Sequence, residues 1–106
     1  MKISESKNSI GEIYNDQFFY IHDKVFNGKI TIDEDVKGYM IYFENVTFND
    51  YIYLTDPMVA NVIFDNCTFS KKDLFVNQTN STTITVQVRS CKLANGDAIT
   101  REDVVK

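Results

Sequence analysis

Few residues in this sequence are of types that support catalysis or metal binding. His22 is the only histidine, and a histidine flanked by carboxylates can act as a general base. The aligned repeats described below place Glu44 and Asp65 near it. No nucleophile with a recognisable motif accompanies His22, which favours a surface histidine beside two acids over a catalytic one.

The two cysteines, Cys67 and Cys91, are the other candidates for chemistry. The sequence has only two cysteines, which do not form a Cys-x-x-Cys pair, and only one histidine. This composition argues against a zinc site. The first 15 residues lack the apolar segment of a secretion signal, which argues against an oxidising compartment and a disulfide. We therefore expect two reduced, inert core residues, and neither a metal nor another cofactor.

Four Asn-x-Thr sequences could be read as glycosylation sites, at Asn45, Asn66, Asn77 and Asn80. The structural interpretation is stronger, because Asn45 and Asn66 fall at the same point of an internal repeat. Asn77 lies at the start of a polar stretch, NQTNSTT, that lengthens the last repeat.

An internal repeat must position all of these residues. Its copies are IYFENVTFND from Ile41, VIFDNCTFSK from Val62 and VQVRSCKLAN from Val86, with a weaker copy, FYIHDKVFNG, from Phe19. A second apolar motif recurs at the same interval, beginning at Ile30, Ile52 and Leu74. Within each copy apolar and polar residues alternate, which is the pattern of β-strands. Repetition every 21–24 residues predicts the stacked coils of a solenoid.

In such a stack, equivalent side chains form ladders across successive coils. The predicted inward ladders are Phe19/Ile41/Val62/Val86, Ile21/Phe43/Phe64/Val88, Phe26/Phe48/Phe69/Leu93, Val46/Cys67/Cys91, Ile30/Ile52/Leu74 and Ile32/Leu54/Val76. A ladder of turn residues is predicted at Asp23, Asn45, Asn66 and Ser90, because Asx and Ser side chains favour tight turns.

The segments FENVTF and FDNCTF resemble coils of right-handed parallel β-helix proteins, including the pectate-lyase-like ones. The segments CTFSKKDLF and CKLANGDAI are similar to pentapeptide-repeat proteins. The resemblance implies an all-β fold, a short right-handed parallel β-helix of about four coils. We expect coils over residues 16–100, an N-terminal cap over 1–15 and a C-terminal cap over 101–106. Thr100 as N-cap with Asp103 three residues later predicts a short helix in the C-terminal cap.

The β-helix enzymes similar to this pattern cleave acidic polysaccharides. They use many more coils and a groove of acidic metal ligands with a basic residue, and this sequence has no matching cluster. We therefore expect a protein that is not an enzyme.

Apolar residues at outward positions are the most informative feature for function. Two stripes are predicted, one of Tyr20, Tyr42 and Ile63, the other of Tyr51, Tyr53 and Phe75. Exposed apolar patches rich in tyrosine mark interaction sites. The N-terminal segment could instead cover one stripe with Ile3, Ile10 and Ile13, or a stripe could be a homodimer seam.

Acidic residues are predicted to form an edge that meets a basic partner or is simply solvated, at Asp33, Glu34, Asp35, Glu44 and Asp65. The chain carries 11 basic and 15 acidic residues, for a net charge of -4. This balance argues against direct binding to nucleic acid, and no apolar run is long enough to span a membrane.

These features predict an inhibitor in the bacterial cytoplasm that binds a larger protein, such as a nucleic-acid-binding enzyme or a toxin with a basic surface. The favoured form is a phage or mobile-element protein that blocks a bacterial defence enzyme. The alternatives are an immunity protein against a toxin, a DNA mimic of the pentapeptide-repeat type, and a structural β-helix oligomer.

Overall fold

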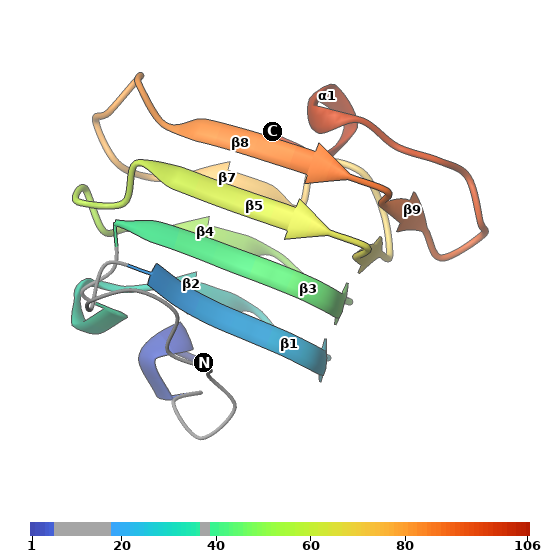
Figure 1. The fold of residues 1–106 in the computed structure, drawn as a ribbon, viewed down its shortest axis with the longest axis horizontal. Coiled ribbons are helices and arrows are strands. Elements are labelled where there is room, and N and C mark those ends of the chain that lie inside the picture. Colours follow the sequence, from blue (N-terminus) through green and yellow to red (C-terminus); the bar gives the residue numbers. More distant parts are fainter. Residues whose placement is uncertain (6–17, 37–38) are drawn as a thin grey trace.

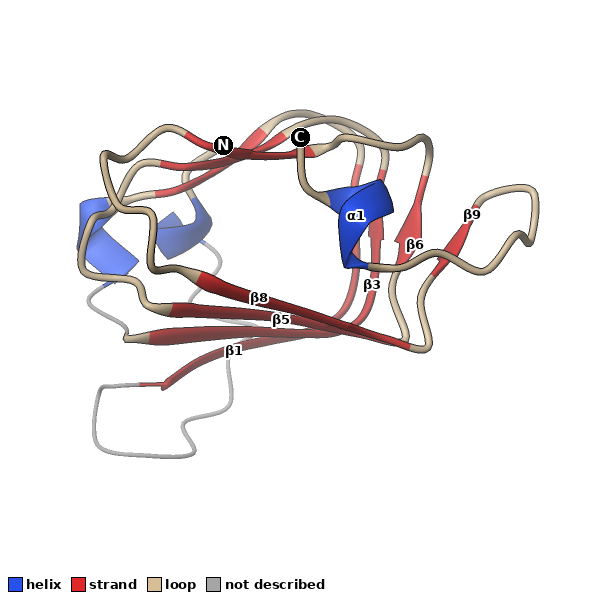
Figure 2. Ribbon diagram, turned by 90° about the horizontal axis from the view of Figure 1, so that it is seen from above, coloured by secondary structure: helices blue, strands red, loops and turns tan. Residues whose placement is uncertain are grey.

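The computed structural model describes residues 1–5, 18–36 and 39–106. They form a parallel β-solenoid of about three turns, in which the long strands stack as rungs (Figure 1). Seen from above in Figure 2, each turn has strands on three sides, and loops together with the short 3-10 helix η2 (Glu34–Val36) lie on the remaining side. The all-β solenoid predicted from the repeat is confirmed.

Two sheets make up these sides. The wide sheet contains β1 (Phe18–Phe26), β3 (Met40–Phe48), β5 (Asn61–Asp65) and β8 (Thr85–Arg89), with β6 (Thr68–Phe69) and β9 (Lys92–Leu93) beyond a bend. The short sheet contains β2 (Ile30–Ile32), β4 (Ile52–Leu54) and β7 (Phe75–Asn77). All pairings between these strands are parallel, as coils of constant direction require.

The bend in the wide sheet arises from residues with left-handed backbone. The four predicted turn residues have nearly the same positive φ, which is 55° at Asp23 and 53° at Asn45, Asn66 and Ser90. Short polar side chains tolerate this region better than other non-glycine residues. Repetition of the same dihedral at the same place turns every coil through the same corner, so the strands on both sides of the bend stay in register.

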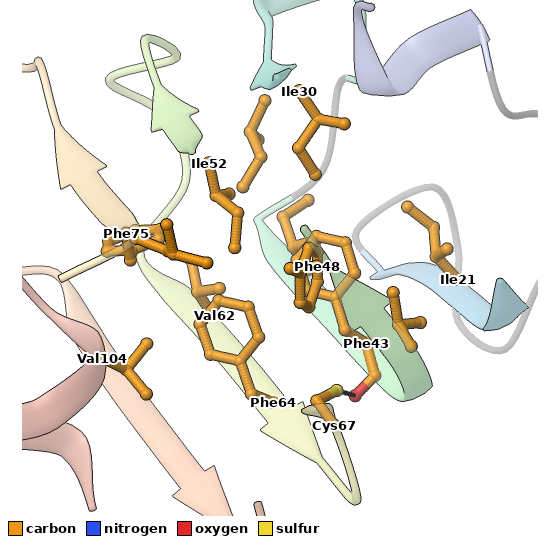
Figure 3. Close-up of a cluster of buried hydrophobic side chains, with 14 of the residues drawn as sticks. Ile21, Ile30, Phe43, Phe48, Ile52, Val62, Phe64, Cys67, Phe75 and Val104 are labelled. Carbon is orange, nitrogen blue, oxygen red and sulfur yellow. Dashed lines mark hydrogen bonds between the residues drawn. The ribbon is translucent and has the colours of Figure 1, made fainter. Parts of the chain in front are cut away.

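Stacked phenylalanines fill the core between the two sheets (Figure 3). The rings of Phe43 and Phe64 stack at 5.2 Å, and Phe48 stacks on Phe69 at the same centroid distance. Edge-to-face contacts join the two stacks, with 5.0 Å between the centroids of Phe43 and Phe48. Three of the predicted inward ladders of the wide sheet are confirmed by the strand register. The members of the fourth, Val46, Cys67 and Cys91, are all buried, as predicted.

The predicted ladders of the short sheet are wrong in the register of their third member, although Leu74 is buried as predicted. Ile52 pairs with Phe75 instead of Leu74, and Val76 lies beside Tyr53 instead of Leu54. The cause is the corner from Phe69 to Phe75, which is two residues longer than the corner from Phe48 to Ile52. Asp73, with φ of 62°, takes up part of this extra length.

The predicted count of four coils is corrected to about three turns. The fourth coil contains β8 and β9, but the chain then reverses, and it returns to the short sheet only as a single parallel bridge between Val105 and Phe75. A tight turn carries out this reversal: Gly96 has φ of 96°, and the Leu93 N–H donates to the Asp97 carbonyl at 2.8 Å. Lys92 and Ala98 form an antiparallel bridge across this turn.

Segments from both ends of the chain cover the open edges of the short sheet. Lys2 bridges to Thr31 on β2, and Ile3 is fully buried in the core. At the other edge Val105 bridges to Phe75 on β7. Edge strands otherwise expose unpaired backbone groups, so these segments act as caps. The predicted covering residues Ile10 and Ile13 lie outside the described residues.

The C-terminal cap contains the helix α1 (Arg101–Val104). The Asp103 carboxylate accepts a hydrogen bond from the Thr100 N–H at 3.0 Å, the reciprocal contact expected of a capping box. Val104 is 1% exposed and points from α1 into the core (Figure 3). In the described part of the chain, no helix has the length and hydropathy needed to cross a bilayer.

A candidate protein-interaction face

The outer side of the wide sheet gathers the aromatic and acidic residues that alternate with the core ladders. Side chains on a strand point alternately to its two faces, so neighbours of the buried residues face outward. Register places His22 beside Glu44, and Glu44 beside Asp65, on successive strands. We call this surface the tyrosine face and define it by Tyr20, His22, Tyr42, Glu44 and Asp65.

Hydrogen bonds to carboxylates hold both tyrosines of this face. The Tyr20 hydroxyl donates to Glu44 Oε1, and the Tyr42 hydroxyl donates to Asp65 Oδ2 at 2.5 Å. Each bond joins a tyrosine to an acid on the next coil, and this acid lies two residues after the residue that pairs with the tyrosine. The rings also contact each other edge-on, with 5.7 Å between their centroids. Both side chains are therefore held in one orientation before any partner arrives.

The carboxylates change the acidity of the phenols. The hydrogen bond to Glu44, burial, and the nearby negative charge raise the pKa of Tyr20 from 10.0 to about 12. The hydrogen bond to Asp65 raises the pKa of Tyr42 in the same way. Because each folded-state pKa lies above its unfolded value, these pairs stabilise the fold up to about pH 10, and that contribution is lost at higher pH.

We expect Glu44→Gln to lower the pKa of Tyr20 toward 10.0, because the neutral amide removes the negative charge beside the phenol. Ultraviolet titration of tyrosinate measures this pKa, and Tyr20→Phe identifies which transition belongs to Tyr20. An unchanged Tyr20 transition in Glu44→Gln would show that the hydrogen bond is not formed in solution.

His22 lies at one end of the tyrosine face. Its ring stacks on Tyr20 with 4.8 Å between centroids, and its Nδ1 is 2.8 Å from Asp23 Oδ2. The hydrogen bond from His22 lowers the pKa of the Asp23 carboxyl, and the hydrogen bond from Asn45 lowers it further by a smaller amount. Glu44 lies beside His22 in the register, as predicted, and its carboxylate accepts the hydrogen bond from Tyr20. The histidine thus has a structural partner in the adjacent turn residue.

Side chains of the turn ladder are hydrogen-bonded between coils. The Asn45 amide donates to Asp23 Oδ1 at 2.7 Å, and one corner further along Asn49 donates to Asn27 at 2.9 Å. These bonds fix the bend at the border of the tyrosine face. Asn45 therefore has two roles, one in its backbone conformation and one in its side chain.

Asn45→Ala is expected to lower the free energy of unfolding by about 1–2 kcal/mol, because alanine is strained at positive φ and loses the bond to Asp23. Asn45→Gly loses the same bond without the strain and should cost less. Urea unfolding of both variants measures the difference. Equal or reversed losses would contradict left-handed strain as the main term.

The place of Ile63 corrects the predicted first stripe. Ile63 stands beside Tyr42 on the outer side, as predicted, but it is only 4% exposed. The reach of Tyr42 to Asp65 brings the ring alongside Ile63, and Gln87 stands on its other side. Ile63 therefore supports Tyr42 and is not itself available to a partner.

The second predicted stripe is also altered. Phe75 is 1% exposed and belongs to the core, so its predicted outward position is wrong. Its place beside Tyr53 is taken by Val76. Tyr51 packs partly against the core, and the Lys71 ammonium lies 4.6 Å from its ring centroid and donates to its hydroxyl. Tyr51 and Tyr53 both remain partly exposed on this side.

The predicted acidic edge is divided by the fold. Asp33 is buried and accepts hydrogen bonds from the Ser4 N–H and hydroxyl, at 3.1 and 2.8 Å. This corrects the expectation that Asp33 faces a partner, because it anchors the N-terminal segment. Glu34 is exposed, and the side chain of Asp35 lies outside the described part. Glu44 and Asp65 are the acids that share a surface with the tyrosines.

Four exposed large apolar residues were not predicted from the sequence, namely Met1, Val25, Tyr39 and Met58. Tyr39 is 54% exposed and Met58 is 75% exposed, and both lie in the loops that precede long strands of the wide sheet. The Ala60 N–H donates to the Tyr39 carbonyl at 2.9 Å, which joins the two loops. Neither Tyr39 nor Met58 belongs to an alternating pattern. The sequence could have indicated their exposure only by placing an apolar residue outside every predicted strand.

A small hollow lies at the C-terminal end of the solenoid. This hollow of about 110 Å³ lies between β7, the following loop and α1, with Phe75, Ile84, Arg101 and Val105 among its lining residues. Pockets for drug-sized ligands are several times larger. Within residues 1–5, 18–36 and 39–106, no three His, Cys, Asp or Glu side chains are grouped to hold a metal ion.

Comparison of the chain with protein-family models, curated proteins and solved structures finds no match. The tyrosine face is thus interpreted from its own geometry.

Proposed function

We propose that this chain is a non-enzymatic inhibitor that docks on a larger protein through the tyrosine face and blocks it. The observation that supports this most strongly is the pair of tyrosines held by carboxylates of the next coil. Tyrosine is enriched among the residues that dominate binding energy at interfaces. The form we favour is a phage or mobile-element protein that blocks a bacterial defence enzyme.

The rigidity of the face supports binding. A partner that docks on a flexible surface must order each rotamer-rich side chain, at about 0.5–1.5 kcal/mol apiece. Tyr20 and Tyr42 are already oriented by hydrogen bonds and ring contacts. The sheet beneath them is anchored by the stacked phenylalanine core. Less conformational entropy is then lost on binding.

The charge of the face supports a basic partner. Glu44 and Asp65 lie side by side on adjacent strands, and Asp23 adds a further carboxylate at the bend. Such a cluster attracts a basic surface and accelerates association with it. The net charge of -4 acts in the same direction. A nucleic-acid-binding defence enzyme presents a basic surface of this kind.

The function is tested in a bacterium that carries defence systems. Expression of the chain is expected to raise the plating efficiency of a phage that one of those systems restricts. Tyr42→Ala should lower the affinity of the chain for the defence protein that it binds by more than about 1 kcal/mol, and it should reduce this protection. Thr68→Ala is the matched control, since Thr68 lies beyond the bend, away from the tyrosine face, and should leave both unchanged.

Tyr42→Phe separates the ring from its hydroxyl, because it keeps the aromatic surface but loses the bond to Asp65. We expect it to bind with intermediate affinity. Equal affinity of the wild type, Tyr42→Ala and Tyr20→Ala for the captured protein would overturn the proposed face. If the sedimenting mass of the chain grows with its concentration, and Tyr42→Ala abolishes this growth, the tyrosine face serves self-association instead.

A further inference from the structure

The two cysteines meet inside the solenoid, on successive coils. Cys67 precedes β6 and Cys91 precedes β9, and the residues that follow them, Thr68 and Lys92, pair in register. The Cys67 N–H donates to Cys91 Sγ at 3.4 Å. Both thiols are free and buried, with Cys67 at 1% and Cys91 at 4% exposure.

Their spacing suits a disulfide. Neighbouring strands in a sheet lie about 4.8 Å apart. Disulfides join residues whose Cα atoms are about 4.4–6.8 Å apart, and the spacing of neighbouring strands falls within this range. Both side chains point to the same inner side, since they continue the ladder that begins at Val46. Rotation of the thiols about their Cα–Cβ bonds then determines whether the sulfurs meet.

The interactions that hold the reduced thiols are weak. Cys67 Sγ lies 3.5 Å from the Phe43 carbonyl, a contact drawn in Figure 3, and Cys91 Sγ lies 3.3 Å from the Phe64 carbonyl. Thiols are poor hydrogen-bond donors, so these contacts oppose rotation only slightly. The reduced pair is therefore close to a cross-linked arrangement.

We propose that Cys67 and Cys91 are a redox-sensitive pair that a hydroperoxide converts to a disulfide, joining the third coil to the last. Cys91 is the residue oxidised first, because it is the more exposed of the two. The side-chain hydrogen bond between the two thiols lowers the pKa of the Cys91 thiol, while the same bond and burial raise the pKa of the Cys67 thiol. The thiolate is the nucleophilic form, so this asymmetry favours attack by Cys91.

The reaction balances in two steps. The Cys91 thiolate attacks a peroxide oxygen; an S–O bond forms, the O–O bond breaks, and the leaving alkoxide or hydroxide takes up a proton. The Cys67 sulfur then attacks the sulfenic acid on Cys91; the S–S bond forms, the S–O bond breaks, and water leaves. Two thiols lose two electrons and two protons in total, and the hydroperoxide is reduced to an alcohol or water.

The disulfide would tether the edge of the wide sheet. Strand β8 is an outermost strand that pairs with β5, and the cross-link would lie just beyond its C-terminal end. Closing the loop between the two cysteines restricts the unfolded chain. Oxidation is therefore expected to raise the unfolding midpoint by about 10 °C.

The test treats the purified full chain with hydrogen peroxide. Intact mass without reductant should fall by two hydrogens, a tryptic digest should contain linked peptides from around Cys67 and Cys91, and dithiothreitol should reverse both changes and the shift in midpoint. Cys67→Val should block the cross-link and leave a sulfenic acid on Cys91 that dimedone labels. In Cys91→Val, dimedone should label little of the remaining Cys67, because Cys67 is the less reactive thiol.

Valine is a suitable replacement, because Val46 occupies the equivalent position of the preceding coil. Cys67→Ser and Cys91→Ser provide a second pair of variants should either valine disturb folding. Oxidation to sulfinic or sulfonic acid without the cross-link would overturn the proposal. Disulfides formed only between separate chains, or thiols unchanged by peroxide in the folded protein, would also overturn it.

Discussion

Phe75→Ala is expected to lower the free energy of unfolding by about 3–5 kcal/mol, the range found when a buried phenylalanine is truncated. Phe75 is 1% exposed and contacts Phe64 edge-on, with 5.9 Å between ring centroids. Its removal leaves a cavity where the short sheet packs on the wide sheet. Thermal and urea unfolding, monitored by circular dichroism, measure the loss.

Val76→Ala is the matched control for Phe75, because it truncates the next residue, which lies beside Tyr53 on the outer side. We expect a loss below about 1 kcal/mol, as for most substitutions away from the core. The alternation read from the sequence predicts the opposite order, with Val76 buried and Phe75 exposed. A larger loss at Val76 than at Phe75 would therefore restore the sequence-based register.

Val104→Asp is expected to destabilise the fold at least as strongly, by about 3–5 kcal/mol. The change places a carboxylate at a position that is 1% exposed, against the end of the core, where burial of a charge is costly. It also displaces the C-terminal cap, in which the Asp73 N–H donates to the Asp103 carbonyl at 2.8 Å. Loss of the cap opens the edge of β7, so aggregation is expected alongside the lower midpoint.

Lys106→Asp is the matched control for this change, since it adds the same carboxylate two residues further on at an exposed position. The Lys106 backbone N–H still donates to the Phe75 carbonyl in this variant. Unfolding midpoints and light scattering of the two variants should differ clearly. Equal stability of Val104→Asp and the wild type would show that the C-terminal segment does not cap the core in solution.

Much of the wide sheet could be predicted because its information is local and repeated. Inward ladders such as Phe43 and Phe64 follow from alternation within each strand and from a constant interval between coils. The left-handed residues Asn45 and Asn66 follow from their chemistry and from recurrence at one aligned place. Parallel in-register stacking converts a sequence interval directly into contact, so a repeat is enough to name the neighbours.

The candidate site was predicted only in part. Tyr20 and Tyr42 were assigned outward from alternation, but their bonds to Glu44 and Asp65 run diagonally between coils. A pattern read along the strand shows which face a side chain occupies and not which neighbour it contacts. The burial of Ile63 has the same origin, because it depends on where the Tyr42 ring lies.

The sequence by itself determined the solenoid, its coil length, its bends and its phenylalanine core, since each depends on a periodic pattern. Only the tertiary structure decided that Phe75 is buried in place of Val76, because two extra corner residues change which side chain reaches the core. It also decided that Asp33 holds Ser4 instead of facing a partner, and that the last coil reverses after Leu93. These features depend on corner lengths and on contacts between distant segments, which no repeat interval encodes.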